Sequence, residues 1–168
     1  MRWQPGEPVC PECGFAWDIS RQAAIGLVAG GPEEATAAVR GVADPLLCDP
    51  LPWSASMYVW HLVDVLRIGA ERLLTLAADP GRGIACWDEN ALADARRYRQ
   101  LSAVVGLTVL RTAAREWEQA ATAAPQDAVV SHPRFGLLDA LDLIRRNAHE
   151  VHHHLLDIHR CQNPGHRA

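Results

Sequence analysis

Histidine residues near the end of the chain have a spacing that suits a metal ion. His149 and His153 are four positions apart, so in a helix both side chains project from the same face. His61, on an earlier predicted helix, is the obvious third ligand. Neutral imidazole binds divalent transition metals, and three protein ligands leave one coordination position open for water or substrate. The sequence therefore predicts a divalent-metal site formed by His61, His149 and His153, with Zn²⁺ as the first choice and Ni²⁺ or another divalent ion as the alternative.

Acidic residues close to these histidines are candidates to orient them. A metal-bound histidine usually donates its second ring N–H to an acceptor. Asp64, Glu150 and Asp157 are near enough in the sequence to serve. Asp157, four residues after His153, is the preferred acceptor, whereas Glu150 is adjacent to a ligand and is expected to project toward a different face. The alternative for each carboxylate is a solvated charge on a helix.

Two further histidines, His152 and His154, flank His153 and are rotated from it by about 100° in opposite directions. We expect one of them to line the pocket and at least one to be solvated. The alternative for all the candidate ligands is a partly buried polar side chain satisfied by hydrogen bonds. A pair at i and i+4 together with a third histidine on another helix favours a metal over that alternative.

Cysteines supply a second pattern, because Cys10 and Cys13 form a C-x-x-C pair before any helical pattern begins. Such a pair is half of a structural zinc site or a redox pair, and the redox interpretation is weaker because no βαβ pattern surrounds it. A closed zinc site needs two more ligands, for which the chain offers Cys161, His159, His166 and His132. Cys48 and Cys86 are expected to be ordinary small residues, and the cysteines to be reduced.

Length and composition indicate one globular domain. A chain of 168 residues can bury a single core without disulfides, and a formal net charge of −4 argues against nucleic acid as the main partner. No run approaches the roughly 18 apolar residues of a spanning helix, and no export segment is visible, so we expect no membrane partner and a cytoplasmic location. We divide the chain into an irregular N-terminal extension, residues 1–17, and a helical bundle, residues 18–168.

Apolar residues recur at helical spacing in several segments. The predicted helices cover approximately residues 20–28, 32–40, 55–76, 89–98, 103–121 and 137–160. Ser54 and Ser102 are candidate N-caps, as is either Asp18 or Ser20 for the first helix. No convincing strand is found. Four substantial helices with apolar stripes can pack around one core, so the expected fold is an all-α four-helix bundle.

Two segments, residues 53–65 (WSASMYVWHLVDV) and 149–158 (HEVHHHLLDI), resemble the signature helices of the DinB-like superfamily. The opening CPECGF is similar to an N-terminal extension in a subset of actinobacterial members. The resemblance implies a bundle in up-down-down-up order and a divalent metal bound by His61, His149 and His153. The related mycothiol-dependent maleylpyruvate isomerases use a similar bundle, with a glutamate where this chain has His149.

The resemblance also implies a chemistry. Members with an assigned activity often transfer a low-molecular-weight thiol, such as mycothiol or bacillithiol, to an electrophile. We therefore expect a metal-dependent thiol S-transferase, with a small-molecule thiol and an electrophilic substrate as partners. The alternatives are a non-catalytic protein that binds a metal or small ligand, and a metal-dependent hydrolase or tailoring enzyme that uses water. A homodimer is left open.

Overall fold

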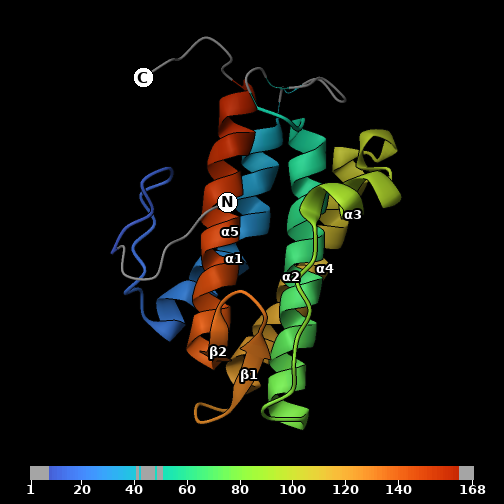
Figure 1. Cartoon of the computed structure of the whole chain (residues 1–168). Coiled ribbons are helices and arrows are strands. Elements are labelled where there is room, and N and C mark those ends of the chain that lie inside the picture. Colours follow the sequence, from blue (N-terminus) through green and yellow to red (C-terminus); the bar gives the residue numbers. More distant parts are fainter. Residues whose placement is uncertain (1–7, 41, 43–47, 49–50, 163–168) are drawn as a thin grey trace.

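The computed structural model describes residues 8–40, 42, 48 and 51–162, and this part of the chain is mainly helical (Figure 1). Its long helices are α1 (Arg21–Val39), α2 (Ala55–Ala78), α4 (Ala103–Ala123) and α5 (Ala140–Gln162). Shorter elements are α3 (Glu89–Ala95), the 3₁₀ helix η1 (Tyr98–Gln100) and the strands β1 (Val129–His132) and β2 (Gly136–Asp139). None of the helices described is long and apolar enough to cross a membrane.

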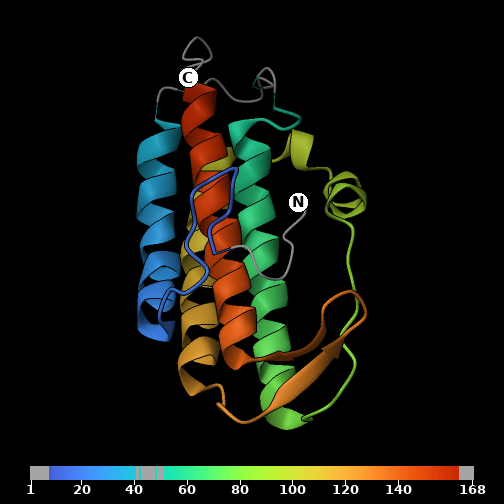
Figure 2. The same ribbon diagram turned by 60° about the vertical axis from the view of Figure 1, so that its left-hand side comes forward.

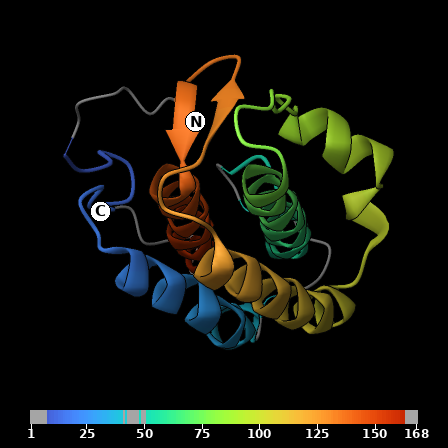
Figure 3. The ribbon, with the colours of Figure 1, turned by 90° about the horizontal axis from the view of Figure 1, so that it is seen from below.

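The long helices form a four-helix bundle with up-down-down-up order. In Figure 1, α1 and α5 run upward, and α2 and α4 run downward, and Figure 2 shows the same order from another side. The connection that carries α3 and η1 returns the chain to the upper end, so α2 and α4 point the same way. Seen from below, α1, α4, α2 and α5 follow one another around the bundle (Figure 3), and each packs against its two neighbours. The expected bundle is confirmed.

Serine side chains begin three of the long helices, as predicted. Ser20 caps α1, Ser54 caps α2 and Ser102 caps α4, each by accepting a hydrogen bond from a backbone N–H in the first turn. Such a bond satisfies one of the N–H groups that have no partner within the helix. For α1, the structure selects Ser20 over Asp18. The start of α2 then fixes the position of His61 in its second turn.

The first helix is longer than predicted. The sequence pattern indicates a break at Gly30-Gly31 and a second helix from Pro32, whereas α1 runs through all three residues. Gly31 lies so close to α5 that a Cβ atom there would be 2.8 Å from Val151 Cγ1. Gly31 and Pro32 are both buried. Packing of α1 against α5 therefore outweighs the unfavourable helix propensity of these residues.

The expectation of no strand was wrong. β1 and β2 form an antiparallel hairpin in which Val129 is opposite Asp139. Residues 81–84 run beside β1, because Gly81 and Ile84 donate backbone hydrogen bonds to it. β2 occupies the residues predicted as the first turn of the last helix, so α5 begins three residues later. Strands of four residues are too short for an alternating pattern to be visible.

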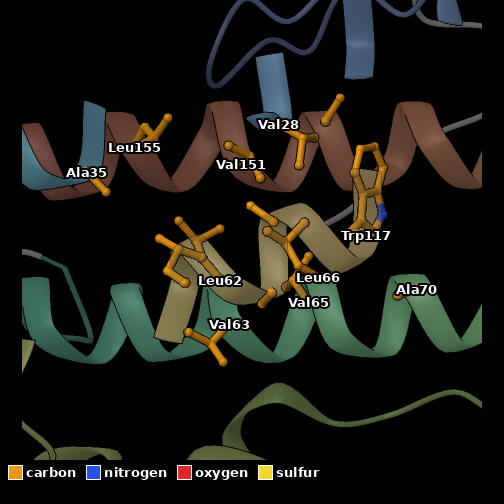
Figure 4. Packing of buried hydrophobic residues seen from close by; sticks show 14 of the residues in the cluster. Val28, Ala35, Leu62, Val63, Val65, Leu66, Ala70, Trp117, Val151 and Leu155 are labelled. Carbon is orange, nitrogen blue, oxygen red and sulfur yellow. The ribbon is translucent and has the colours of Figure 1, made fainter. Parts of the chain in front are cut away.

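The core lies between the four long helices (Figure 4). Leu62 and Leu66 of α2 face Val151 of α5, with Val28 of α1 and Trp117 of α4 packed around them. These side chains are almost completely buried. Fully burying one such aliphatic side chain contributes about 1.5–3 kcal/mol, so the bundle does not depend on a metal ion for its core.

A polar contact fixes α5 against two neighbours within this core. The indole N–H of Trp117 donates to Asn147 Oδ1 at 2.9 Å, and Asn147 Nδ2 donates to the Val65 carbonyl at 3.4 Å. Asn147 fits because the facing position on α2 is Gly69, where a Cβ atom would collide with the amide. Asn147 therefore joins α4 and α2 to the turn of α5 that precedes the histidines.

A disulfide joins Cys48 to Cys161 in the last turn of α5. This bond corrects the expectations that the cysteines are reduced, that Cys48 is an ordinary small residue and that Cys161 is free to bind a metal. The two positions are 113 residues apart, so no local spacing indicates their pairing. A crosslink over such a distance restricts the unfolded chain strongly.

We expect replacement of both cysteines, Cys48→Ser with Cys161→Ser, to lower the free energy of unfolding by about 2–4 kcal/mol, because the unfolded chain regains its freedom. Denaturant unfolding without reductant, followed by circular dichroism, measures the change. Cys86→Ser removes an exposed free thiol and is the matched control. Equal stability of the double variant and the unmodified protein would contradict the assignment.

Candidate metal centres

The helix α5 presents metal-ligating side chains on two faces. His149 and His153 are one pair at i and i+4, and Glu150 and His154 are a second pair, displaced by one residue and hence by about 100° around the helix. The structure places these pairs in two different groups of ligand atoms, and a third group joins His153 and His154 with Asp157. His61 lies with Glu150 and His154, and not with the two histidines predicted to accompany it.

The first centre consists of His61, Glu150 and His154, whose ligand atoms all lie within 4.8 Å of one another. Glu150 Oε2 is 3.6 Å from His61 Nε2 and 3.4 Å from His154 Nε2. The expectation that Glu150 projects away from the face of His149 holds, but that other face is the one that meets α2. The sequence contained the signal for this set, because Glu150 and His154 have the same spacing as the pair we chose.

The surroundings of the first centre favour an ionised Glu150 and a neutral His61. Burial alone raises the pKa of Glu150, but His154 and His61 lower it well below its ordinary value. Burial lowers the pKa of His61. Burial also lowers the pKa of His154, yet the hydrogen bond to Asp157 and the nearby Glu150 carboxylate raise it overall, to about 9. His154 must therefore lose a proton before it can bind a cation.

Asp157 orients the ring of His154. His154 Nδ1 is 3.0 Å from Asp157 Oδ2, and Arg160 donates to Asp157 Oδ1, also at 3.0 Å. With its proton on Nδ1, His154 donates to Asp157 and turns Nε2 toward Glu150. His153, the partner predicted for this carboxylate, is more distant, at 3.6 Å between Nε2 and Oδ2. Asp157 thus contacts mainly His154, which was predicted as a possible pocket residue but not as a metal ligand.

Aromatic rings hold the two histidines of the first centre in place. Trp87 stacks on His61 with ring centroids 5.6 Å apart, and Trp53 packs against the same ring at 5.1 Å. Tyr58 stacks on His154 at 5.2 Å. A cavity of about 360 Å³ opens beside these residues, and all of them except Trp87 line it. The centre therefore faces a space large enough for a small molecule.

A second cavity, of about 260 Å³, adjoins the first, since His61 and Glu150 line both. Arg72 of α2, Arg134 of the β1–β2 turn and Arg146 of α5 also line it, and we call it the arginine cavity. The three arginines come from separate segments, so no motif in the sequence indicates that they converge. Guanidinium groups in a concave site are suited to bind carboxylate or phosphate.

The second centre consists of Cys10, Cys13, His149 and His153, whose ligand atoms also lie within 4.8 Å of one another. Cys10 and Cys13 are free thiols. Burial raises the pKa of Cys13 to about 11 and lowers that of His149 to about 4. The C-x-x-C pair and the histidine pair, which were predicted to belong to different sites, therefore lie together in one site.

The partners predicted for the C-x-x-C pair lie elsewhere. Cys161 is in the disulfide. His132 Nε2 is 3.9 Å from Cys86 Sγ, and His159 Nε2 is 3.6 Å from a carboxylate oxygen of Glu34. The remaining candidate, His166, is outside the described residues. Of the flanking histidines, His154 lines the first cavity, and His152 contacts the Cys13 carbonyl oxygen through Nε2 at 3.0 Å.

Comparison with known proteins identifies a family and structural similarity to a solved protein. A family profile described as the DinB superfamily matches residues 2–158. YfiT from Bacillus subtilis, described as a probable metal-dependent hydrolase with an unusual four-helix bundle topology, has a TM-score of 0.75 and 18% sequence identity to this chain. The match covers 95% of this chain and 91% of YfiT, and at this identity it establishes the fold alone. Among curated proteins, none matches.

Asp64, one turn after His61, connects α2 to the α3–η1 segment. Its carboxylate accepts hydrogen bonds from the Arg96 guanidinium and the Tyr98 hydroxyl. Asp64 was predicted to orient a metal ligand, but its described contacts are with this segment. The side chain of Arg96 is 33% exposed, whereas that of Asp64 is only 5% exposed.

We expect Asp64→Ala to lower the free energy of unfolding by about 2–3 kcal/mol. Removing one partner of a fully buried ion pair costs about 3–5 kcal/mol, and partial exposure of Arg96 reduces that cost. Tyr98→Phe, which removes a single hydrogen bond, should cost only about 1 kcal/mol. Denaturant unfolding of both variants measures the difference, and a loss for Asp64→Ala no larger than that for Tyr98→Phe would show that the ion pair is not the main contribution.

Proposed function

The chain belongs to the DinB superfamily, and from this premise and the geometry of the first centre we propose that it is a metal-dependent enzyme whose ion is bound by His61, Glu150 and His154. The observation that carries the proposal is the convergence of these three side chains beside a cavity of about 360 Å³. Three ligands on one side of an ion leave the side toward the cavity open.

The residues present fit a divalent cation. The separations from Glu150 to His61 and His154 exceed a normal hydrogen-bond length, so the polar atoms converge without bonding directly to one another. His61 Nε2 faces Glu150, and His61 Nδ1 is buried without a hydrogen-bond partner among the described residues, so either ring nitrogen of His61 is free to bind an ion. Two imidazoles and a carboxylate are a ligand set that Zn²⁺ accepts, and Zn²⁺ is our first choice of ion. An ion bound there would lower the pKa of a thiol or water in the cavity, so that the nucleophile exists at neutral pH.

The chain's own residues prepare the site for such a step. Asp157 holds the tautomer and direction of His154, and Arg160 in turn fixes Asp157. Trp53 and Tyr58 pack against the two histidine rings and line the cavity, which limits the access of bulk water. A rigid and partly dry site strengthens the interaction of its fixed charges with a developing charge.

We propose that the nucleophile is a low-molecular-weight thiol, with mycothiol as the first candidate, as the sequence resemblance implies. In the transfer, the thiol loses its proton, a bond forms between sulfur and the electrophilic carbon, and the electrophile releases a leaving group or takes up a proton. The cavity combines aromatic walls with the polar residues Glu12, Asn90 and Arg160 at its edge, which suits a polar thiol beside an apolar carbon skeleton.

Water is the second candidate nucleophile, and the ligand set favours it. Two histidines and a glutamate are the protein ligands of zinc in several hydrolases. YfiT, which shares the fold, is itself described as a probable metal-dependent hydrolase. Thiol transfer and hydrolysis use the same residues in the same roles, so the identity of the nucleophile must be decided by experiment.

The arginine cavity supports a further step concerning the substrate. Arg72, Arg134 and Arg146 surround a space that shares His61 with the first cavity. We propose that the electrophile carries a carboxylate or phosphate, which binds in the arginine cavity while the reacting carbon lies beside the first centre. A hydrogen bond to a charged group contributes about 1.5–3 kcal/mol, enough to select an anionic substrate over a neutral one.

We expect thiol transfer to require metal and to saturate with the correct thiol, because the thiol needs the open position of the first centre. His61→Ala and Glu150→Gln should remove both bound metal and activity, and Asp157→Asn should lower activity by about 10–100-fold. His159→Ala, on the same helix but exposed, is the control. The assay follows loss of mycothiol with a model electrophile, with bacillithiol and glutathione tested alongside.

Turnover of an ester or amide without any thiol, by metal-loaded protein that transfers none of the thiols, would exclude the transferase and favour the hydrolase. Metal bound without either activity would favour a binding protein. Retention of all bound metal in His61→Ala would exclude the first centre itself.

For an anionic electrophile, we expect Arg72→Gln and Arg134→Gln each to raise KM by about 10-fold or more, since each removes a charge-assisted hydrogen bond. A neutral ester of the same electrophile should be affected little by either substitution. Steady-state kinetics with the acid and ester pair provide the comparison, and Arg67→Gln, at a position that lines neither cavity, is the control. Equal effects on acid and ester would contradict recognition of the anion.

A further inference from the structure

We propose that the chain binds a second, structural Zn²⁺ through Cys10, Cys13, His149 and His153, and that this ion fastens the N-terminal segment to α5. The proposal does not depend on the function proposed for the first centre. Two sulfur and two nitrogen ligands complete a tetrahedral set with no open position, which is typical of structural rather than catalytic zinc.

The separations of the four ligand atoms are close to those of such a site. Zn–S and Zn–N bonds of about 2.3 and 2.0 Å place tetrahedral ligands about 3.3–3.8 Å apart. The four atoms here lie within 4.8 Å of one another, although they come from two segments more than 130 positions apart in the chain. A contraction of about 1.5 Å at most between any two of these atoms would therefore close the site around an ion.

The backbone already holds the cysteines in a tight turn. Cys10 N donates to the Phe15 carbonyl and Gly14 N donates to the Cys10 carbonyl, both at 2.8 Å. Gly14 has a φ of +75°, which a residue with a side chain rarely adopts. A β-bridge between Val9 and Ala16 closes the turn. The thiols are thus arranged by hydrogen bonds of the turn, and no disulfide joins them.

The histidines offer nitrogen atoms that need a partner. His149 Nε2 and His153 Nδ1 are buried and accept or donate no hydrogen bond within the described residues. Leaving a buried polar atom in this state is unfavourable, and a bound ion would remove that cost. The other nitrogen of His153, Nε2, is 3.6 Å from Asp157 and 3.7 Å from Glu12, so acceptors for its proton are near.

Aromatic rings enclose the second centre. Trp17 and Phe15 pack on His149 with ring centroids 4.6 and 5.3 Å apart. Cys10 is 8% exposed and His149 is 2% exposed. Cys13 is partly exposed and His153 lines the first cavity, but four protein ligands leave no position for a substrate, so we assign the ion a structural role.

Cobalt substitution tests the proposal on the unmodified chain. Metal-free protein titrated with Co²⁺ should bind two equivalents, and one of them should give the near-ultraviolet charge-transfer absorption of a cobalt–thiolate bond. Cys10→Ser with Cys13→Ser should abolish that band and one equivalent of metal. Cys86→Ser, which removes the exposed free thiol, should change neither, and circular dichroism checks that each variant is folded.

His61→Ala and His149→Ala separate the two centres. His61→Ala should lose one equivalent and keep the thiolate band, whereas His149→Ala should lose the band. Loss of the same single ion in both variants would restore the histidine triad predicted from the sequence and overturn the second centre. Absence of the thiolate band in the unmodified protein, or a disulfide between Cys10 and Cys13 in the protein as purified, would also overturn it. Failure of the first centre alone would leave the band intact.

Discussion

The rotation of about 100° between successive residues of a helix is the constraint on which both centres depend. His149 and His153 point from α5 toward the N-terminal segment, and Glu150 and His154 point toward α2. One run of adjacent residues therefore supplies two ligand pairs to different neighbours. Because the two pairs are interleaved, neither centre could be moved along α5 without displacing the other. The packing of α5 against α2 and the position of the N-terminal segment are therefore linked.

Periodicity and capping were sufficient to predict the long helices and the bundle from the sequence, because these signals are local. The same periodicity identified His149 and His153 as a pair on one face. It did not identify the neighbour of that face, since the rotation of a helix about its axis depends on packing with distant residues. A rotation equal to a single residue exchanges one pair for the other, and this is why Glu150, although correctly expected on another face than His149, was not counted among the ligands.

Other differences also arise from contacts between distant segments. The pairing of Cys48 with Cys161 and the meeting of Cys10 with α5 have no signature in local spacing. Pro32 remains within a helix because α1 is packed against α5 on the side of Gly31. The hairpin strands are too short to carry a pattern. The incorrect predictions fall where two local conformations are almost equal in free energy and tertiary packing selects one of them.

The side chain of Asn147 packs against α2 in the space that Gly69 leaves for lack of a Cβ atom, and a hydrogen bond from the indole of Trp117 fixes it there. Asn147 lies one turn before Glu150 and belongs to neither set of ligands. Its contacts nevertheless fix the rotation of α5 about its axis along the stretch that carries the ligands. The geometry of both centres consequently depends on the same rotation of α5. Any rotation of α5 about its axis would displace both pairs of ligands at the same time, because they lie on one rigid stretch of helix.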